Sequence, residues 1–289
     1  EFFARSSSAL AYLSGARWRA GYHAFGGEAS YRGNLMTHPL SFNPYLHTSQ
    51  TFQLLVEALD HPAGLFPTFD LVPPPAADAG ALFVPPPQEV AAVRRLVWQE
   101  LGRAAGHRLI LLNANASDLM PLRRWDGERY VELARRLLDT HGDVAILFTG
   151  APSEAAAVEE LVRRVGSPRC ASMAGKTTLR QLLVLYQLAE VLVTNDSGPA
   201  HFATLTEIDV VVLFGPETPQ LFAARSPRTH PQWARLACSP CINAFNDRNS
   251  SCRNNVCMQR LTVDQVFAEV CRLAEVRRTG QRDRFRLVA

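Results

Sequence analysis

The sequence predicts an α/β protein of two domains, the second of which holds a parallel sheet covered by helices on both faces. From Arg108 onward, short apolar runs alternate with amphipathic segments of helical length, as in a series of βα units. Polar residues and glycines follow several of these runs, at the place where parallel sheets bind ligands. A stretch rich in proline and alanine, residues 69–87, cannot join a central strand and indicates a surface connection before this domain.

The composition fits this architecture and disfavours several other classes of protein. With 289 residues and 47% hydrophobic content, the chain can bury a large core in one or two domains. A net charge of +3 gives no electrostatic case for nucleic acid or an anionic membrane as partner. No apolar run approaches the roughly 18–20 residues of a membrane span. Six cysteines in a chain of this length do not indicate a disulfide-stapled secreted domain.

The first part of the chain is predicted to contain a helix closed by Gly15, a short strand at 18–22 and a helix at 44–60. The segment between the last two, residues 24–43, is predicted to be a loop. Four of its polar side chains suit hydroxyl groups and acidic sugars, and together they are candidate contacts for an acceptor: Tyr31, Arg32, Asn34 and His38. A plain solvated loop is the alternative.

The elements of the second part follow from its apolar periodicity. A helix at 89–102 leads into residues 102–106, which we interpret as a hinge, so the domain boundary is placed at 103/104. Right-handed crossovers are expected between the parallel strands that follow. Strands are predicted at 109–113, 144–149, 191–193 and 210–214, with helices at 127–141, 153–165, around 179–186 and at 263–274.

The strand at 191–193 and the residues after it are the stretch around which the chain is organised. Asn195 to Gly198 is predicted to be a tight turn, and Pro199 to start a helix. The free amides and the positive dipole end of a helix start can hold a phosphate, and His201 can donate to a phosphate oxygen or a leaving group. The alternative is a capped βα connection with His201 packed locally. Gly-x-Gly-x-x-Gly does not follow the first strand, which disfavours a dehydrogenase. A complete P-loop motif does not occur either.

Several motifs, taken in order, resemble one known family. The run Thr194-Asn-Asp-Ser-Gly-Pro-Ala-His-Phe-Ala203, followed by Leu213-Phe-Gly-Pro216, is similar to the donor-site signature of family 9 glycosyltransferases, the ADP-heptose:lipopolysaccharide heptosyltransferases and their relatives. The likeness extends from about Arg108 to Val270. It implies two Rossmann-like lobes of the GT-B type: a partial acceptor-binding lobe at 1–103, which includes the Pro-rich connection, and a complete donor-binding lobe at 104–275. A basic tail at 276–289 follows them.

The resemblance also assigns residues to the donor site. Arg123 matches a basic residue that binds phosphate and, together with His201, would stabilise the leaving group; Arg124 is the alternative to Arg123. Glu154 matches a carboxylate that accepts hydrogen bonds from ribose hydroxyls. The other donor-binding residues are a polar loop and a phosphate-holding turn: Asn115 and Ser117, then Asp196, Ser197, Gly198, Pro199 and Ala200.

The implied reaction is the inverting, metal-independent transfer of a sugar, heptose in the best-known members, from an ADP-linked donor to a saccharide or glycolipid acceptor of lipopolysaccharide core type. No Asp-x-Asp pair is present to hold a divalent metal, and no cofactor is expected. The resemblance implies a cytoplasmic protein, or a peripheral one at the inner face of the bacterial inner membrane. It also places the general base upstream of Glu1. Two alternatives therefore stay open, a non-catalytic nucleotide-binding fragment and a nucleotide-sugar epimerase of the same two-lobed fold.

Four late cysteines form a pattern of their own. Cys238, Cys241, Cys252 and Cys257 are spaced as Cys-x2-Cys-x10-Cys-x4-Cys. Two such pairs can hold a structural zinc ion. The second pair is spaced more widely than the usual Cys-x2-Cys, so unmetallated thiols or a loop clip are preferred.

Overall fold

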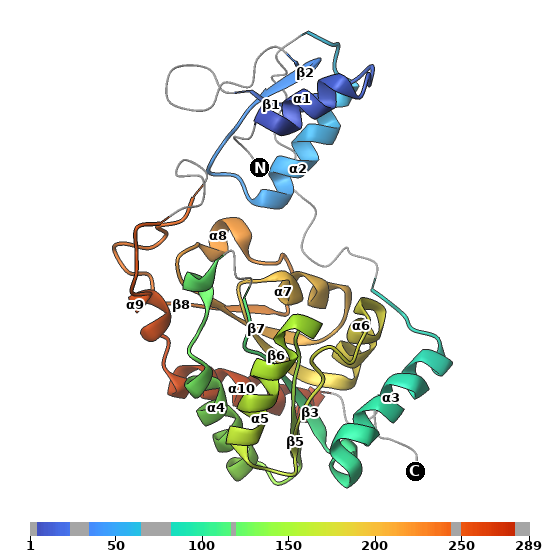
Figure 1. Ribbon diagram of the computed structural model, residues 1–289, viewed down its shortest axis with the longest axis vertical. Helices are drawn as coiled ribbons and strands as arrows, with labels where there is room; N and C mark the ends of the chain where they lie inside the picture. Colours follow the sequence, from blue (N-terminus) through green and yellow to red (C-terminus); the bar gives the residue numbers. More distant parts are fainter. Residues whose placement is uncertain (1–4, 24–34, 65–81, 117–119, 244–249, 281–289) are drawn as a thin grey trace. The chain divides into compact units, whose positions relative to one another are not determined.

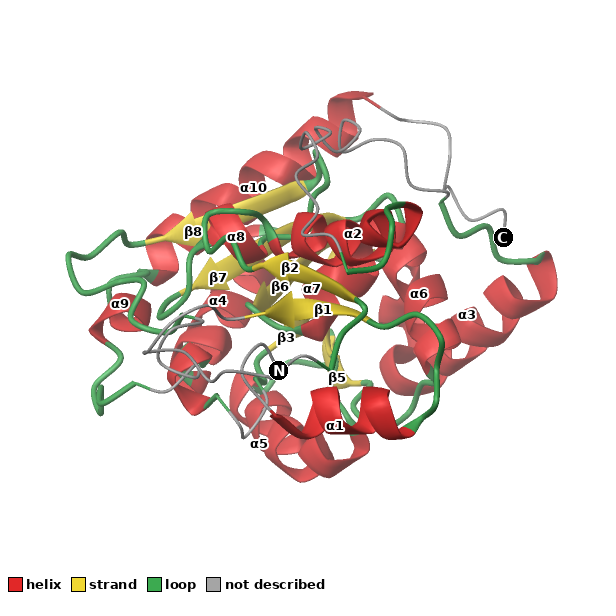
Figure 2. Ribbon diagram, turned by 90° about the horizontal axis from the view of Figure 1, so that it is seen from above, coloured by secondary structure: helices red, strands yellow, loops and turns green. Residues whose placement is uncertain are grey.

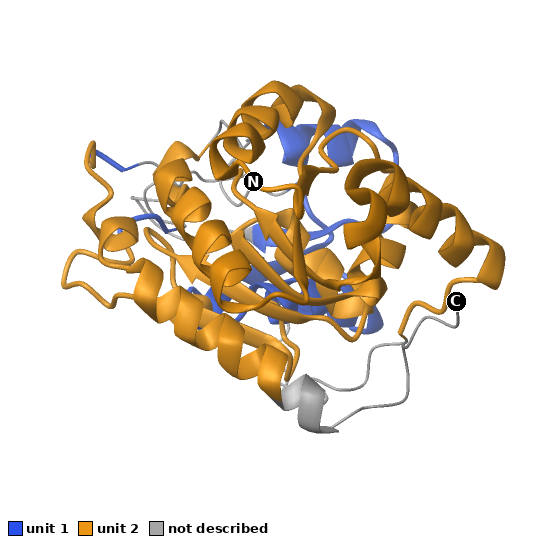
Figure 3. Cartoon of the chain, turned by 90° about the horizontal axis from the view of Figure 1, so that it is seen from below, with its two compact units in different colours: residues 1–76, 220–222, 241–251 blue, residues 77–219, 223–240, 252–289 orange. Residues whose placement is uncertain are grey.

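The computed structural model describes residues 5–23, 35–64, 82–116, 120–243 and 250–280 (Figure 1). The chain divides into two compact units (Figure 3): Glu1–Ala76 with Gln220–Phe222 and Cys241–Ser251, and Ala77–Pro219 with Ala223–Pro240 and Cys252–Ala289. The main boundary lies earlier than the expected position at 103/104. It precedes helix α3 (Pro87–Leu101) because this helix packs against a helix and a strand of the second unit.

In its described residues 5–23 and 35–64, the first unit contains a two-stranded parallel sheet and two α-helices around a small core. The buried apolar side chains at its centre are those of Tyr22, Leu40 and Ala58. The two predicted helices and the predicted strand at 18–22 are confirmed to within a few residues. The elements are α1 (Arg5–Leu13), β1 (Ala20–His23), β2 (His38–Ser41) and α2 (Thr48–Glu57), which is followed by a 3-10 helix, Ala58–Asp60.

Two local features of this unit differ from the prediction. Strand β2 lies in the segment predicted to be a loop, and that part of the prediction is wrong. The strand has only four residues and buries just His38 and Leu40, so its alternation is too short to stand out in the sequence. Helix α2 starts at Thr48 because His47 caps it; the His47 N–H donates to Gln50 Oε1 at 3.1 Å.

The second unit is built on a six-stranded sheet in which all neighbouring strands run parallel. The strand order is β5-β4-β3-β6-β7-β8. All four strands predicted for this part are present. The sequence does not predict β5, which has three residues, or β8, which has no apolar run. The strands are β3 (Arg108–Asn113), β4 (Val144–Phe148), β5 (Cys170–Ser172), β6 (Ala189–Asn195), β7 (Asp209–Phe214) and β8 (Thr229–Trp233).

Helices cover both faces of this sheet (Figure 2). Three of them, α4 (Gly127–Thr140), α5 (Ala155–Val165) and α10 (Val263–Gly280), share one apolar cluster with the strands. Helix α3 packs on α6 (Leu179–Leu188) at the other face. Residues 102–106, interpreted as a hinge, instead form a 3-10 helix, Gly102–Gly106. The three shorter helices of this part of the chain are α7 (Gly198–Phe202), α8 (Pro219–Phe222) and α9 (Val256–Gln259).

The core of the second unit follows from the alternation of side chains along its strands. Ile110, Leu112, Val191 and Val193 point to the face covered by α4, α5 and α10, and all four are almost fully buried. The intervening side chains, such as that of Leu111, point to the other face and are buried as well. Burial on both faces explains why the strands appear in the sequence as unbroken apolar runs. In the described parts of the chain, no helix combines the length and the hydropathy needed to cross a bilayer.

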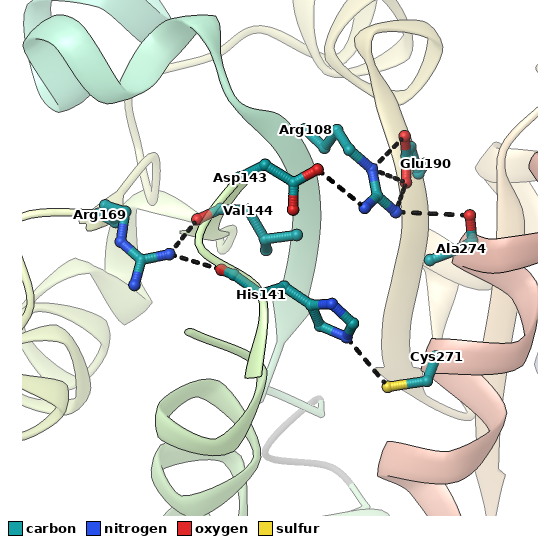
Figure 4. A network of polar contacts seen from close by, with 8 residues as sticks. All are labelled: Arg108, His141, Asp143, Val144, Arg169, Glu190, Cys271 and Ala274. Carbon is teal, nitrogen blue, oxygen red and sulfur yellow. Dashed lines mark hydrogen bonds and ion pairs between the residues drawn. The ribbon is translucent and has the colours of Figure 1, made fainter. Parts of the chain in front are cut away.

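The amino end of the sheet is held together by polar contacts (Figure 4). Arg108, the first residue of β3, donates to both carboxylate oxygens of Glu190 on β6, at 2.8–3.1 Å, and to Asp143 at 3.3 Å. A further N–H of Arg108 reaches the Ala274 carbonyl of α10 at 3.4 Å. Because these groups bind one another across the strands and α10, this edge has a structural role. The opposite edge, where the strands end, contains the residues predicted to bind a ligand.

Candidate functional site

The strand order places a switch point between β3 and β6. The chain proceeds from β3 to β4 and β5 on one side, and from β6 to β7 and β8 on the other. The loops that follow β3 and β6 therefore diverge at the carboxyl edge and leave room between them, which is where doubly wound sheets of this order bind nucleotides. Asn115 and Arg123 follow β3, Asp196 and Ser197 follow β6, and Glu154 lies beyond the end of the neighbouring strand β4.

Asn195, the last residue of β6, ties the two sides of this switch point together. Its side chain is fully buried. Its amide donates to the carbonyls of Ala114 (3.2 Å) and Asn115 (3.1 Å), and its oxygen accepts the backbone N–H of Trp125 at 3.0 Å. The sequence interpretation gave Asn195 only a place in a turn. In the structure, its hydrogen bonds connect the end of β6 to the loop that follows β3.

Arg123 lies at the end of a short 3-10 helix, Pro121–Arg123, and reaches across to the loops after β6 and β7. Its Nη1 donates to the Asp196 carbonyl at 3.3 Å, and its Nε lies 3.7 Å from Asp196 Oδ2. Its Nη2 donates to Glu217 Oε2 at 2.6 Å. We call Arg123, Asp196 and Glu217 the Arg123 cluster. The sequence reasoning did not single out Glu217, because nothing in its neighbourhood indicates a partner 94 residues away.

The loops after β3 and β4 meet at Gly150. A side chain at this position would come within 2.9 Å of Asn115 Nδ2 and 3.1 Å of Glu154 Oε2. Glycine is therefore required for the Asn115 amide and the Glu154 carboxylate to approach each other at the sheet edge. One Glu154 oxygen accepts the Ala151 N–H at 2.7 Å. The Asn115 Nδ2 is buried and has no hydrogen-bond partner among the described residues.

The turn after β6 differs in detail from the predicted helix start. Helix α7 has only five residues, so its dipole is small. Pro199 has no N–H, and the Ala200 N–H donates to the Ser197 carbonyl at 3.1 Å. Of the three backbone N–H groups in the stretch Ser197 to Ala200, which was predicted to hold a phosphate, at most those of Ser197 and Gly198 can serve. His201 is exposed on this short helix.

The side chain of Ser197, which precedes α7, makes no capping hydrogen bond. Ser197 is the N-cap residue, but its hydroxyl donates to the Asn195 carbonyl at 3.1 Å instead. Asp196 is directed to Arg123 through the contacts described above, and its own N–H donates to the Leu213 carbonyl at 3.1 Å. The turn is therefore fixed by its contacts to β7 and to Arg123.

The end of β7 packs closely against α9. A side chain at Gly215 would come within 2.4 Å of Met258 Sδ and 3.2 Å of Cys257 Sγ. Cys257 and Met258 are buried there. Glycine at 215 thus lets α9 lie against the strand end that leads to Glu217.

Arg124 and Trp125 have mainly structural roles. Trp125 is buried, and its indole N–H donates to the Leu261 carbonyl at 2.8 Å. Arg124 donates to the Ala116 carbonyl at 2.8 and 3.1 Å. It lines a cavity of about 520 Å³ at the start of α4, together with Asn115, Arg129 and Asn255 among others. Arg129 in turn donates to the Gln259 and Leu261 carbonyls, so both arginines of this cavity are held by backbone oxygens.

Several predicted residues have no described structural setting. Ser117, Tyr31, Arg32 and Asn34 lie outside the described residues. His38 is described and is 3% exposed. Its ring nitrogens are 2.8 Å from Thr37 Oγ1 and 3.1 Å from the His61 carbonyl, so its polar atoms are engaged within the first unit rather than offered to an acceptor.

Cys238, Cys241, Cys252 and Cys257 form no disulfide bond among the described residues, and Cys238 is exposed. Among the described residues, no group of three or more histidine, cysteine, aspartate or glutamate side chains is arranged to hold a metal ion. The structural zinc therefore gains no support, and the preference for unmetallated thiols stays a prediction. Cys170 is buried, and this burial raises the pKa of its thiol to about 12.

The curated proteins that this chain resembles in sequence are heptosyltransferases. Lipopolysaccharide heptosyltransferase 2 of Salmonella typhimurium is 34% identical over 140 residues, which cover 43% of this chain and 40% of the relative. Lipooligosaccharide heptosyltransferase 2 of Campylobacter jejuni is 26% identical over 176 residues, or 58% of this chain and 52% of the relative. The matches thus span about half of these relatives or less.

Solved structures share the fold. The structure of E. coli ADP-heptose lipopolysaccharide heptosyltransferase II aligns with a TM-score of 0.67 at 18% identity, covering 95% of this chain and 75% of that one. A family 9 glycosyltransferase from Veillonella parvula aligns with a TM-score of 0.65 at 19% identity, covering 93% and 71%. These confirm the predicted fold of the GT-B type. The model of glycosyltransferase family 9 (heptosyltransferase) matches residues 4–250. With most of its length covered by that match, the chain belongs to glycosyltransferase family 9.

Proposed function

We propose that this chain carries the donor site of a heptosyltransferase-type enzyme. The enzyme takes an ADP-linked sugar, heptose by analogy with the relatives, and transfers it to a saccharide acceptor of lipopolysaccharide core type. Transfer inverts the anomeric carbon and needs no divalent metal. The observation that carries the proposal is the convergence of Asn115, Arg123, Glu154 and the Ser197 turn at the switch point of a doubly wound sheet.

Each of these groups has a chemical task under the proposal. The Glu154 carboxylate accepts hydrogen bonds from the ribose hydroxyls, and the Asn115 amide, which has no partner among the described residues, donates to a phosphate or sugar oxygen. The Ser197 and Gly198 amides and Arg123 bind the diphosphate. A related E. coli heptosyltransferase of the same fold has been solved with ADP, which supports the choice of nucleotide.

The chemical step is a displacement at the anomeric carbon. The acceptor oxygen forms a bond to that carbon while the bond to the diphosphate oxygen breaks, and the departing ADP takes the electron pair. Arg123, together with His201, which is exposed on α7, counters the charge that develops on the leaving group. These two groups take the part that a divalent metal takes in other transferases. A base outside this site has to take the proton of the acceptor.

Calorimetric titration with ADP tests the nucleotide site and its independence of metal. We expect ADP to bind in EDTA as tightly as in Mg²⁺, because arginine and backbone amides supply the positive potential. His201→Ala and Arg123→Ala should each weaken binding by about tenfold or more, as expected for one charge-assisted contact to phosphate. A matched control is Arg135→Ala, since Arg135 lies on α4 and donates to carbonyls at the end of α5, Arg164 among them. Binding that requires Mg²⁺ would contradict the metal-free site.

A transfer assay separates the proposal from its two alternatives. ADP-heptose is supplied with a lipopolysaccharide core acceptor, and both ADP release and the glycosylated acceptor are measured. Formation of both products supports the transferase. Conversion of the donor into an epimer would favour the epimerase. ADP binding without any turnover would identify the chain as a nucleotide-binding fragment.

A further inference from the structure

Glu217 is a charged group at the donor site that no motif of the sequence indicates. It follows the end of β7, and its side chain is only 2% exposed. Its contact to Arg123 Nη2, at 2.6 Å, is a short, charge-assisted hydrogen bond. A buried carboxylate at the edge of a binding site requires a physical reason, since its desolvation is costly unless it is paired.

The Arg123 cluster holds one guanidinium from two sides. Asp196, after β6, accepts from Nη1 through its carbonyl, and Glu217, after β7, accepts from Nη2. A guanidinium has five N–H groups in a fixed planar fork, so these two bonds determine the directions of the other three. The side chain of Arg123 stays 16% exposed. Its Nε is buried and lies 3.7 Å from Asp196 Oδ2, so the N–H groups left on Nη1 and Nη2 are the ones that are oriented before any ligand arrives.

A diphosphate could in principle compete with Glu217 for Arg123. Breaking the pair would leave a buried carboxylate without its counter-charge, which costs more than one phosphate contact returns. The second oxygen of Glu217, Oε1, is buried and has no hydrogen-bond partner among the described residues, so these offer no other donor in place of Arg123. The pair is therefore expected to persist when a ligand binds.

We infer that Glu217 is a positioning residue for the donor: it holds the Arg123 guanidinium so that its remaining N–H groups meet the diphosphate already in place. Glu217 itself does not touch the ligand. The inference rests on the proposed function, which supplies the diphosphate at this site. It explains why a carboxylate lies beside a binding site for an anion, where its charge alone would be unfavourable.

Calorimetric titrations of ADP and of inorganic pyrophosphate into four proteins test this inference: the wild type, Glu217→Gln, Arg123→Ala and the double variant. Glu217→Gln should weaken both ligands by about three- to tenfold, because the ligand must then order a rotamer-rich side chain itself. In the Arg123→Ala background this loss should disappear: Glu217→Gln should leave both affinities unchanged or raise them, because the carboxylate no longer has a guanidinium to position. If Glu217 were only a negative charge close to the phosphates, its removal would tighten binding in both backgrounds, and that result would overturn the inference.

Glu190→Gln is a matched control for general loosening of the fold. Like Glu217, Glu190 pairs with an arginine: its carboxylate lies 2.8 Å from Arg108, and its side chain is 22% exposed. It is the second residue of β6 and therefore lies at the amino edge of the sheet, away from the proposed site. It should lower the melting temperature and leave the affinity for ADP unchanged. An equal loss of affinity in both glutamine variants would show that Glu217 stabilises the unit and does not position Arg123.

A spectroscopic readout reports on Arg123 without any ligand. In ¹⁵N NMR spectra, the side-chain N–H groups of a guanidinium fixed on two sides give resolved, slowly exchanging signals. We expect such signals for Arg123 in the wild type and in Glu190→Gln, and their loss in Glu217→Gln. Equally sharp signals in Glu217→Gln would contradict the inference.

The outcomes distinguish this inference from the proposed function. If pyrophosphate binds in a Glu217-dependent way but ADP does not bind, the proposed nucleotide fails and the positioning role stands. If ADP binds equally well to the wild type and Glu217→Gln, the positioning role fails and the donor site stands. If neither ligand binds, both fail.

Discussion

At the scale of single residues, the carboxyl edge of the second unit depends on positions where a side chain has no room. Gly150 allows Asn115 and Glu154 to approach each other, and Gly215 allows Met258 to lie against the end of β7. Neither position has a left-handed backbone, so the requirement is for space and not for conformation. Such requirements come from partners distant in the chain, and a sequence alone does not reveal them.

We predict that Gly215→Ala destabilises the second unit by about 1–3 kcal/mol, the usual cost of overpacking a core. The added Cβ would lie 2.4 Å from Met258 Sδ, and Met258 is 1% exposed and cannot move outward freely. Urea unfolding measures the loss. Gly142→Ala is the control, because Gly142 has no heavy atom within 4 Å of the added methyl. Equal effects of the two substitutions would show that α9 is not packed as described.

At the scale of elements, Tyr22 joins β1 to α2. Its hydroxyl donates to the Thr51 carbonyl inside the first unit. Burial raises the pKa of Tyr22 from 10.0 to about 12. Since the folded state favours the neutral phenol more than the unfolded chain does, this stabilisation is complete below pH 10 and is lost as the pH rises from 10 towards 12.

The prediction is that the stability advantage of the wild type over Tyr22→Phe shrinks with rising pH. It should be constant from pH 8 to 9.5 and fall by up to about 2 kcal/mol by pH 11.5, in proportion to the pKa shift. Urea unfolding of both proteins across this range gives the difference. An advantage that stays constant to pH 11.5 would mean that Tyr22 ionises at its ordinary pKa.

The elements also show how far sequence reasoning reaches. Buried parallel strands and amphipathic helices depend on local periodicity, so β3, β4, β6 and β7 could be predicted, and with them the edge where the site lies. Strand β8 could not, because it has no apolar run. Helix α7 has only five residues because a 3-10 helix, Ala203–Leu205, follows it at once.

For the proposed site, the sequence predicted the groups that would meet a ligand but not those that hold them. Asn195 bonds to Trp125, 70 positions away, and Glu217 to Arg123, 94 positions away. A motif records neighbours in the chain, whereas these pairs exist only because parallel strands bring distant loops to one edge. Supporting residues of this kind therefore become visible only with the fold.

At the scale of the whole molecule, the two units differ greatly in how much apolar surface they bury. Among the described residues, the apolar cluster of the first unit has three buried members, whereas that of the second takes in buried residues of five strands and several helices. All described groups of the proposed donor site belong to the second unit. Ligand binding should therefore stabilise one unit and not the other.

We predict that ADP protects only the second unit against hydrogen exchange. At a concentration one hundred times its dissociation constant, a ligand adds about 2.7 kcal/mol to the unfolding free energy of the unit that binds it. Backbone amides of β3 and β6 that exchange by unfolding of that unit should then slow by about a hundredfold, while those of β1 and β2 keep their rates. Mass spectrometry of peptides with and without ADP measures both. Equal slowing of the two units would show that they unfold together, and slowing in β1 and β2 alone would move the nucleotide site to the first unit. Arg123→Ala supplies the control, because at the same ADP concentration its weaker binding should reduce the protection of β3 and β6 and leave the first unit unchanged.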